Sequence, residues 1–280
     1  MNFADYQAIP ALNASSIKRG ANSMAEMRFF TNNPMKETKA LYMGRAFHLA
    51  VLEPDEWANV LTFTGSSRNS KAYKELKENH PRALILSPAE HNVIARAADY
   101  LTKCPDVQEL LAGTEREVSL TWDDAEIGHK CKCRIDAVRI GDAPVVVEVK
   151  SARELGKNCR AFIRQSAQLN YHLQLGFYRR GYRAVYGEEP QVKVMAVQLE
   201  PFPDHAIMVC DPYQLMVAEA ECVRIARQYL ECCKAGAWPG VGNAKFDVPG
   251  WASGMDEIPA IEVNPEVEGM SDDEFASKYL

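Results

Sequence analysis

The chain carries the stretch Lys130-Cys-Lys-Cys-Arg-Ile-Asp136, followed after a turn by Val145-Val-Val-Glu-Val-Lys150. The first segment alternates between polar and apolar residues, and the second is a mostly apolar run. They predict two antiparallel strands joined by a short loop. Side chains two residues apart share one face of a strand, so Glu148 and Lys150 point the same way. A hairpin can bring Asp136 to that face. Two carboxylates there can hold a hard divalent cation, and a neighbouring lysine can orient a water or stabilise a developing anion.

The length of the hairpin loop decides whether Asp136 and Glu148 meet. A two- or four-residue loop pairs residues whose numbers have an odd sum, which places Asp136 opposite Val149 on the wrong face. A loop of three or five residues, or a bulge, pairs Asp136 with Glu148, and Gly141 suits such a loop. The alternative is an ordinary hairpin with surface carboxylates. Because Glu148 interrupts a buried-looking valine run, where a carboxylate is costly unless paired or ligated, we expect the metal site.

A histidine in the N-terminal half is a further candidate ligand. His48 lies in Gly44-Arg-Ala-Phe-His48, inside a helix expected over residues 37–52. A lone histidine on a helix is usually structural. Beside an acidic metal site it becomes a candidate imidazole ligand.

Polar and basic side chains after the hairpin are candidates for DNA contacts. A single long helix is expected over residues 159–186, and its spacing of three, three and four residues predicts one polar face, made by Gln168, Tyr171, Gln174 and Tyr178. These side chains can contact phosphates or support the metal site, or they can form ordinary polar surface. Basic residues form a candidate phosphate-binding rim, although such charges are often merely solvated: Lys130, Lys132, Arg134, Arg153, Lys157, Arg160 and Arg164.

Composition and element order place these motifs in one α/β domain. Helices are expected in residues 1–112, and residues 113–245 are expected to form the sheet core, with three strands, a helix, a strand and a last helix. The net charge of the 280 residues is −6, but residues 246–280 form an acidic tail, so the rest is close to neutral and a basic groove is not excluded.

Several other classes of protein are disfavoured. The eight cysteines, without a signal peptide or a membrane-length apolar run, favour reduced thiols in the cytoplasm and no membrane association. No phosphate-binding loop of the G-x-x-x-x-G-K-[ST] type suggests an ATPase, and no G-x-S-x-G motif suggests a serine hydrolase.

Taken together, the motifs resemble the RecE-type exodeoxyribonuclease VIII group of the PD-(D/E)xK (RecB-like) nuclease superfamily. The family pattern is a G-x-x-x-H helix, an Asp, an (E/D)-x-K strand and a Q-x-x-x-Y helix. Here the same order is given by Gly44 to His48, Asp136, Glu148-Val-Lys150 and Gln174-Leu-Gly-Phe-Tyr178. One departure is the residue before the aspartate, which is Ile135 where the motif's name has proline.

The resemblance implies a restriction-endonuclease-like core with a mixed central sheet and a helical N-terminal extension. It also implies Mg²⁺- or Mn²⁺-dependent digestion of linear double-stranded DNA, 5′ to 3′, which leaves 3′ single-stranded tails for recombination. A RecT-like annealing protein would load on those tails, and family members form ring-like oligomers.

The predicted roles follow from the motifs and the resemblance together. We expect His48, Asp136, Glu148 and the Val149 carbonyl to bind one or two cations, with Lys150 acting on the water and Gln174 and Tyr178 supporting catalysis. The expected DNA contacts are Arg134, Arg153, Arg164 and Tyr171. Two rivals remain open, an endonuclease of the same fold and a non-catalytic module that binds DNA or a protein partner.

Overall fold

The computed structural model describes residues 1–242 apart from residues 2, 34, 36, 65–66 and 82. Within it, Met1–Val241 forms one compact unit. The acidic tail expected over residues 246–280 lies outside the described residues. None of the helices in the described part of the chain is both long enough and apolar enough to cross a membrane.

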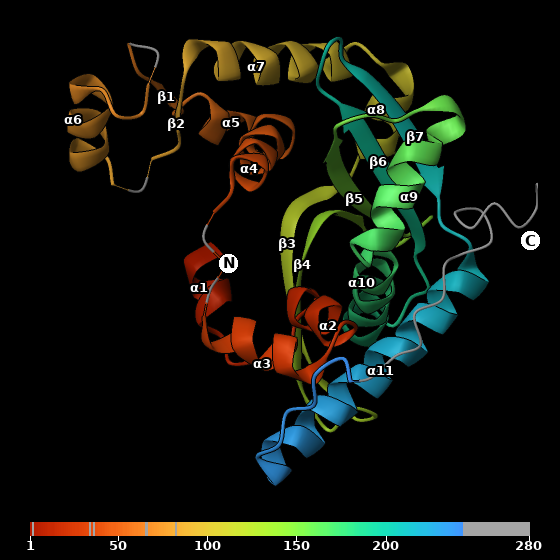
Figure 1. The fold of residues 1–280 in the computed structure, drawn as a ribbon. Coiled ribbons are helices and arrows are strands. Elements are labelled where there is room, and N and C mark those ends of the chain that lie inside the picture. Colours follow the sequence, from red (N-terminus) through yellow and green to blue (C-terminus); the bar gives the residue numbers. More distant parts are fainter. Residues whose placement is uncertain (2, 34, 36, 65–66, 82, 243–280) are drawn as a thin grey trace, which may run out of the picture. The chain divides into compact units, whose positions relative to one another are not determined.

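A five-stranded mixed sheet forms the centre of this unit (Figure 1). Neighbouring strands of the sheet are antiparallel, except that the third and fourth strands are parallel to each other. The strands lie in chain order: β3 (Glu115–Asp124), β4 (His129–Arg139), β5 (Val145–Ala152), β6 (Gln191–Gln198) and β7 (Asp204–Val209). The first four strands were expected from the sequence, whereas β7 was not.

Helices cover both faces of the sheet, and each face has its own apolar core. One core includes Ile17, Phe177 and Ile225, all fully or almost fully buried. The helices on that face are α2 (Ala14–Gly20), α3 (Met24–Asn32), α10 (Tyr171–Tyr186) and α11 (Pro212–Ala235). Gly181 lets α10 approach the sheet closely, because a β-carbon there would lie 2.7 Å from the Trp122 ring.

The opposite face is covered by a second group of helices, with Phe47, Ile94 and Val107 in its core. These helices are α4 (Lys39–Leu52), α7 (Pro88–Thr102) and α8 (Pro105–Leu111). The expected capping box at the start of α7 is confirmed: the Ser87 side chain accepts from the Glu90 amide, and the Glu90 carboxylate accepts from the Ser87 amide.

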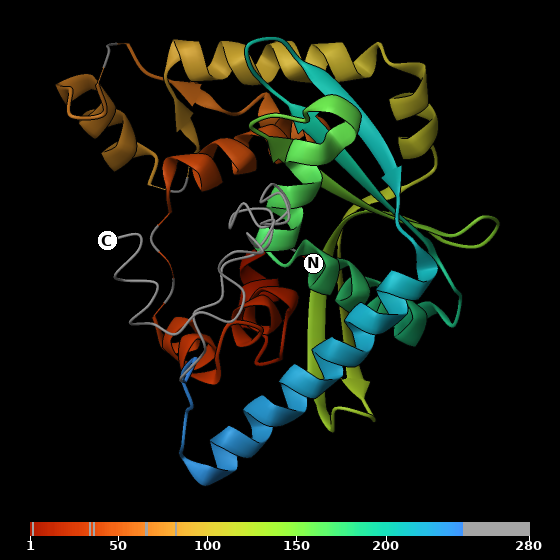
Figure 2. The same cartoon turned by 45° about the vertical axis from the view of Figure 1, so that its right-hand side comes forward.

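The remaining elements are short. A two-stranded parallel sheet, β1 (Leu61–Thr62) and β2 (Ile85–Leu86), stands beside α6 (Lys71–Asn79), which lies at the edge of the molecule away from the main sheet (Figures 1 and 2). The others are α1 (Phe3–Ala8), α5 (Pro54–Trp57), η1 (Lys157–Cys159) and α9 (Arg160–Gln168).

The single helix expected over residues 159–186 is wrong, because the chain breaks into α9 and α10. Asn170 adopts a left-handed conformation with a φ of 53° and ends the helical path between the two segments. Asparagine tolerates this conformation better than most residues. The break places Gln168 on an exposed part of α9, so Gln168 does not continue the polar face of α10 as predicted.

The hairpin between β4 and β5 has a five-residue loop, one of the two lengths that bring Asp136 opposite Glu148. Arg139 pairs with Val145, Ala137 pairs with Val147, and residues 140–144 form the loop. Gly141 supplies a positive φ of 82° within it. The register that the metal-site prediction required is therefore present.

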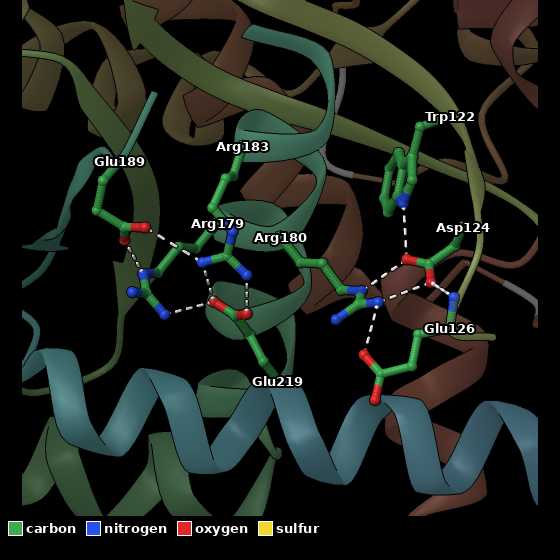
Figure 3. A network of polar contacts seen from close by, with 8 residues as sticks. All are labelled: Trp122, Asp124, Glu126, Arg179, Arg180, Arg183, Glu189 and Glu219. Carbon is green, nitrogen blue, oxygen red and sulfur yellow. Dashed lines mark hydrogen bonds and ion pairs between the residues drawn. The ribbon is translucent and has the colours of Figure 1, made fainter. Parts of the chain in front are cut away.

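A network of charged side chains ties α10 to the β3–β4 turn and to α11 (Figure 3). At the turn, the Arg180 guanidinium donates to both oxygens of the buried Asp124 carboxylate, at 2.6 and 2.7 Å. The Trp122 indole donates to the same carboxylate at 2.9 Å. Burial alone would raise the pKa of Asp124, but these donors outweigh burial and lower its pKa to about 2.

Asp124→Asn is expected to lower the free energy of unfolding at pH 7 by about 2 kcal/mol. The folded-state pKa lies below the ordinary value of 3.8, so the contribution is complete above about pH 5 and is lost as the pH falls through about 2. Urea denaturation of both proteins at several pH values between 7 and 3 measures the difference, with the exposed neighbour Asp123→Asn as control. A difference that stays constant down to pH 3 would contradict this origin.

Candidate active site

The site lies at a fork between β4 and β5. Their ladder ends at the pair Ala137–Val147, after which β5 continues along β6 only. On the other side of the fork Leu12 takes the place beside β4, with its amide donating to the Lys130 carbonyl at 3.0 Å. Asp136 and Glu148 are the first residues beyond the last pair.

Asp136 is held in place by the backbone amide of Val149, which lies beyond the end of the β4–β5 ladder. The Val149 N–H donates to Asp136 Oδ2 at 2.7 Å, and the other oxygen, Oδ1, lies 3.6 Å from His48 Nδ1. Burial first, and then the charge of Glu148, raises the pKa of Asp136 well above its usual range. A buried carboxylate pair of this kind is stabilised by a proton or by a cation.

His48 reaches the fork from α4, on the opposite face of the sheet from α10. Burial lowers the pKa of His48, and the nearby Lys150 lowers it further. A neutral imidazole next to a carboxylate is the form that binds metal ions.

Glu148 has one oxygen engaged and one without a partner. Its Oε1 accepts from Gln174 Nε2 at 2.6 Å and from the Lys150 ammonium. Its Oε2 is buried and has no hydrogen-bond partner among the described residues. Since the side chain is only 2% exposed, leaving this oxygen without a hydrogen bond is costly. A divalent cation that accepts Oε2 as a ligand would remove this cost.

Lys150 is held charged by its carboxylate neighbours. Burial pulls the pKa of Lys150 down, but Glu148 and Asp136 outweigh burial and keep it above its ordinary value. The ammonium also lies 4.7 Å from the centroid of the Tyr171 ring. It is therefore a fixed positive charge beside the carboxylates, available to a water or a phosphate oxygen.

Helix α10 supports the site from the other side. Gln174 and Tyr178 are buried one turn apart, and Gln174 Nε2 donates to the Tyr178 hydroxyl oxygen at 2.9 Å as well as to Glu148. Burial and the charge of Glu148 raise the pKa of Tyr178 well above its ordinary value, so it stays protonated. These contacts fix the orientation of the Glu148 carboxylate.

The four residues predicted to contact DNA differ in their exposure and in their partners within the protein. Arg153 and Arg164 are exposed, and Tyr171 is half-buried beside Lys150. The guanidinium of Arg134 donates to the Glu117 carboxylate at 2.6 Å and is 14% exposed, so much of its charge is used within the protein. Contact of these four residues with DNA stays a prediction.

Glu117 is a site residue that the sequence did not reveal. It lies on β3 across from Asp136, and its ligand oxygen lies within 4.8 Å of those offered by His48 and Asp136. Glu148 is not part of this group, so its carboxylate oxygens do not lie within that distance of all three ligand atoms. Glu117 has a φ of 51°, a strained conformation for this residue type that is often found at functional sites.

Glu117→Gln is expected to weaken binding of Mg²⁺ or Mn²⁺ by roughly ten- to a hundredfold, because it removes one negative charge from the group around Asp136. Isothermal titration of the metal-free protein measures the affinity. Glu115→Gln, an exposed position on the same strand, is the matched control. Equal affinities in all three proteins would show that Glu117 only pairs with Arg134.

The chain is similar in fold to a solved structure from Eubacterium rectale described as a candidate exonuclease. The two share 16% sequence identity, and the match covers 93% of this chain and 99% of that one with a TM-score of 0.58. A second solved structure, SSO0001, shares 15% identity over 74% of this chain and 84% of its own, with a TM-score of 0.31. A comparison with curated proteins gives no match.

A family model matches most of the chain. The model is that of the PDDEXK-like domain of unknown function, DUF3799, and it covers residues 14–246. These residues include Asp136, Glu148 and Lys150 at the fork, together with His48 and α10. The chain therefore belongs to this family of PDDEXK-like domains, and its mixed sheet flanked by helices is the restriction-endonuclease-like α/β core.

Proposed function

We propose that this protein is a divalent-cation-dependent nuclease that degrades linear double-stranded DNA from its ends. The observation that carries the proposal is the fork, where Asp136 lies beside His48 and the neighbouring strand carries the paired Glu148 and Lys150. The buried Glu148 Oε2, which has no hydrogen-bond partner among the described residues, supports a cation at this point. Nucleases of the PD-(D/E)xK type combine the same residue types in the same order.

The side chains divide the work of phosphodiester hydrolysis between them. A cation bound by His48, Asp136, Glu148 and the Val149 carbonyl would lower the pKa of a water and neutralise charge on the phosphate. Lys150 orients that water or donates to a non-bridging phosphate oxygen, since its ammonium stays charged. Gln174, fixed by Tyr178, holds Glu148 in one orientation so that the site is organised before substrate binds.

The finer assignment follows the RecE-type resemblance. The order of the four motifs, from His48 to Tyr178, supports an exonuclease of that group over a site-specific endonuclease. Digestion would run 5′ to 3′ in the cytoplasm and leave 3′ tails. A RecT-like annealing protein would bind the tails during phage or prophage recombination, and the nuclease would work as a ring-like homo-oligomer.

Digestion of two DNA forms tests the proposal. One is a linear duplex labelled at either its 5′ or its 3′ end, and the other is a covalently closed circle of the same sequence, each with Mg²⁺, with Mn²⁺ or with EDTA. We expect metal-dependent loss of the linear duplex, release of the 5′ label first, and an intact circle. Cutting of the circle would show an endonuclease, and no digestion of either DNA would overturn the nuclease.

A further inference from the structure

A second lysine reaches the site from the N-terminal part of the chain. Lys18 lies on α2, a helix whose first turn is capped by the Asn13 side chain. Its ammonium donates to Gln174 Oε1 at 2.9 Å, and Lys150 donates to the same oxygen at 3.5 Å. The two ammonium groups lie 5.1 and 4.7 Å from the centroid of the Tyr171 ring.

Lys18 has no carboxylate ion-pair partner within the described part of the chain, in contrast to Lys150 and Arg19. Lys150 is paired with Glu148, and Arg19, the next residue on α2, is paired with Glu26. Lys132 is buried too, but its ammonium donates to three backbone carbonyls. Lys18 has one amide oxygen, which it shares with another cation.

The charge of Lys18 is only partly balanced, because Glu148 attracts it without an ion-pair contact while Lys150 and Arg19 repel it. A partly buried ammonium loses hydration, and a neighbouring ammonium repels it, so its charge needs an anion nearby. Burial first, and then the charge of Lys150, lowers the pKa of Lys18 to about 8. At neutral pH Lys18 is therefore protonated in most molecules. The residue is only partly buried, so an anion from solution can reach it.

We propose that Lys18 binds a backbone phosphate of the nucleic acid at the site, so that the bound strand supplies the direct ion-pair partner that Lys18 lacks among the described residues. This inference rests on the proposed function, because it assigns the substrate's phosphodiester as the anion. Gln174 orients Lys18 through the amide oxygen while its nitrogen holds Glu148, so one buried side chain couples the phosphate contact to the carboxylate. Lys18 and Lys150 then face the same strand as two point charges, a common form of phosphate recognition.

Binding without cleavage tests the inference. Anisotropy of a fluorescent duplex, with Ca²⁺ in place of Mg²⁺ to suppress cleavage, gives the affinity of the wild type, Lys18→Met and Lys18→Arg at several salt concentrations. We expect Lys18→Met to bind roughly tenfold more weakly and its log–log salt slope to fall by roughly 0.7–0.9, the value of one phosphate contact. Lys18→Arg, which keeps the charge, should retain most of both.

A surface lysine supplies the matched control. Lys103→Met removes a charge that is 71% exposed and paired with Asp99, and it should leave affinity and slope unchanged. The inference is overturned if the wild type binds DNA and Lys18→Met binds it with the same affinity and slope, even if cleavage is slower. Absence of DNA binding by the wild type would instead overturn the proposed function itself.

The pH dependence of binding separates a phosphate contact from a merely structural lysine. Within the described residues, the charged and titratable groups that face Lys18 are Lys150, Glu148, Arg19 and Tyr171. As the pH rises through about 8, free Lys18 loses its proton, so wild-type affinity should fall over that range. The fall should be absent in Lys18→Arg, whose side chain stays charged. An equal fall in both proteins would contradict the role of Lys18.

Discussion

Replacing Lys150 with methionine, or Asp136 with asparagine, should reduce cleavage of linear duplex DNA by roughly a hundred- to a thousandfold. Lys150 is a fixed positive charge paired with the buried Glu148, and loss of a charge stabiliser of this kind costs roughly 10²–10³ in rate. Asp136 accepts from the Val149 amide and faces His48, so asparagine at this position removes the central anion of the cation site. Single-turnover digestion of an end-labelled duplex measures both effects.

The two variants should differ in metal binding. Asp136→Asn should lose most of its affinity for Mg²⁺ or Mn²⁺ in a calorimetric titration, whereas Lys150→Met should keep its affinity. Thermal melting and circular dichroism show whether each variant is folded, and Lys103→Met is the control for loss of a lysine. Cleavage at the wild-type rate in either folded variant would remove that residue from the mechanism.

The second large effect concerns stability. Glu219→Ala should lower the free energy of unfolding by about 2–4 kcal/mol, because removing one partner of a buried ion pair leaves the other charges uncompensated. Glu219 is 6% exposed on α11, and its two oxygens accept from Arg179 and Arg183, both at 2.5 Å (Figure 3). The expected loss is at the lower end of such effects, since Arg183 is partly exposed and both arginines also contact Glu189.

A neighbour on the same helix provides the control. Glu221 pairs with Arg224 at the surface, where ion pairs contribute about 0–1 kcal/mol, so Glu221→Ala should change stability little. Urea denaturation at pH 7 measures both variants. Equal effects of the two substitutions would mean that the α10–α11 contact is held by its apolar core alone.

The sequence predicted the parts of the site that depend on local spacing. Alternation placed Glu148 and Lys150 on one face, and the parity of the loop reduced the register to two choices. The structure has the register in which Asp136 and Glu148 come directly after the last β4–β5 pair, Ala137 and Val147. His48 could be named as a candidate because the acidic site gave it a role. These inferences need only the periods of strands and helices.

Other parts could not be predicted, because they depend on contacts between distant segments. Glu117 and Lys18 sit in ordinary patterns, and only the folded chain brings them beside Asp136 and Gln174. The strand β7 follows a proline-rich turn at residues 200–203 and has mostly half-buried side chains, so its pattern is weak. The break at Asn170 lies inside an otherwise helical pattern, and a single asparagine is not enough to predict a left-handed residue.

The five-residue loop between β4 and β5 has a consequence for anyone who redesigns this protein. Valines occupy both faces of β5 before Glu148, so in that part of the strand a slip of one residue would change the buried apolar surface little. Glu148 and Lys150 protect the register instead, because a slip would move both charged side chains into the opposite apolar layer, away from Gln174. A graft that shortens or replaces residues 140–144 is therefore expected to lose stability together with the site, and a stability screen would detect the error.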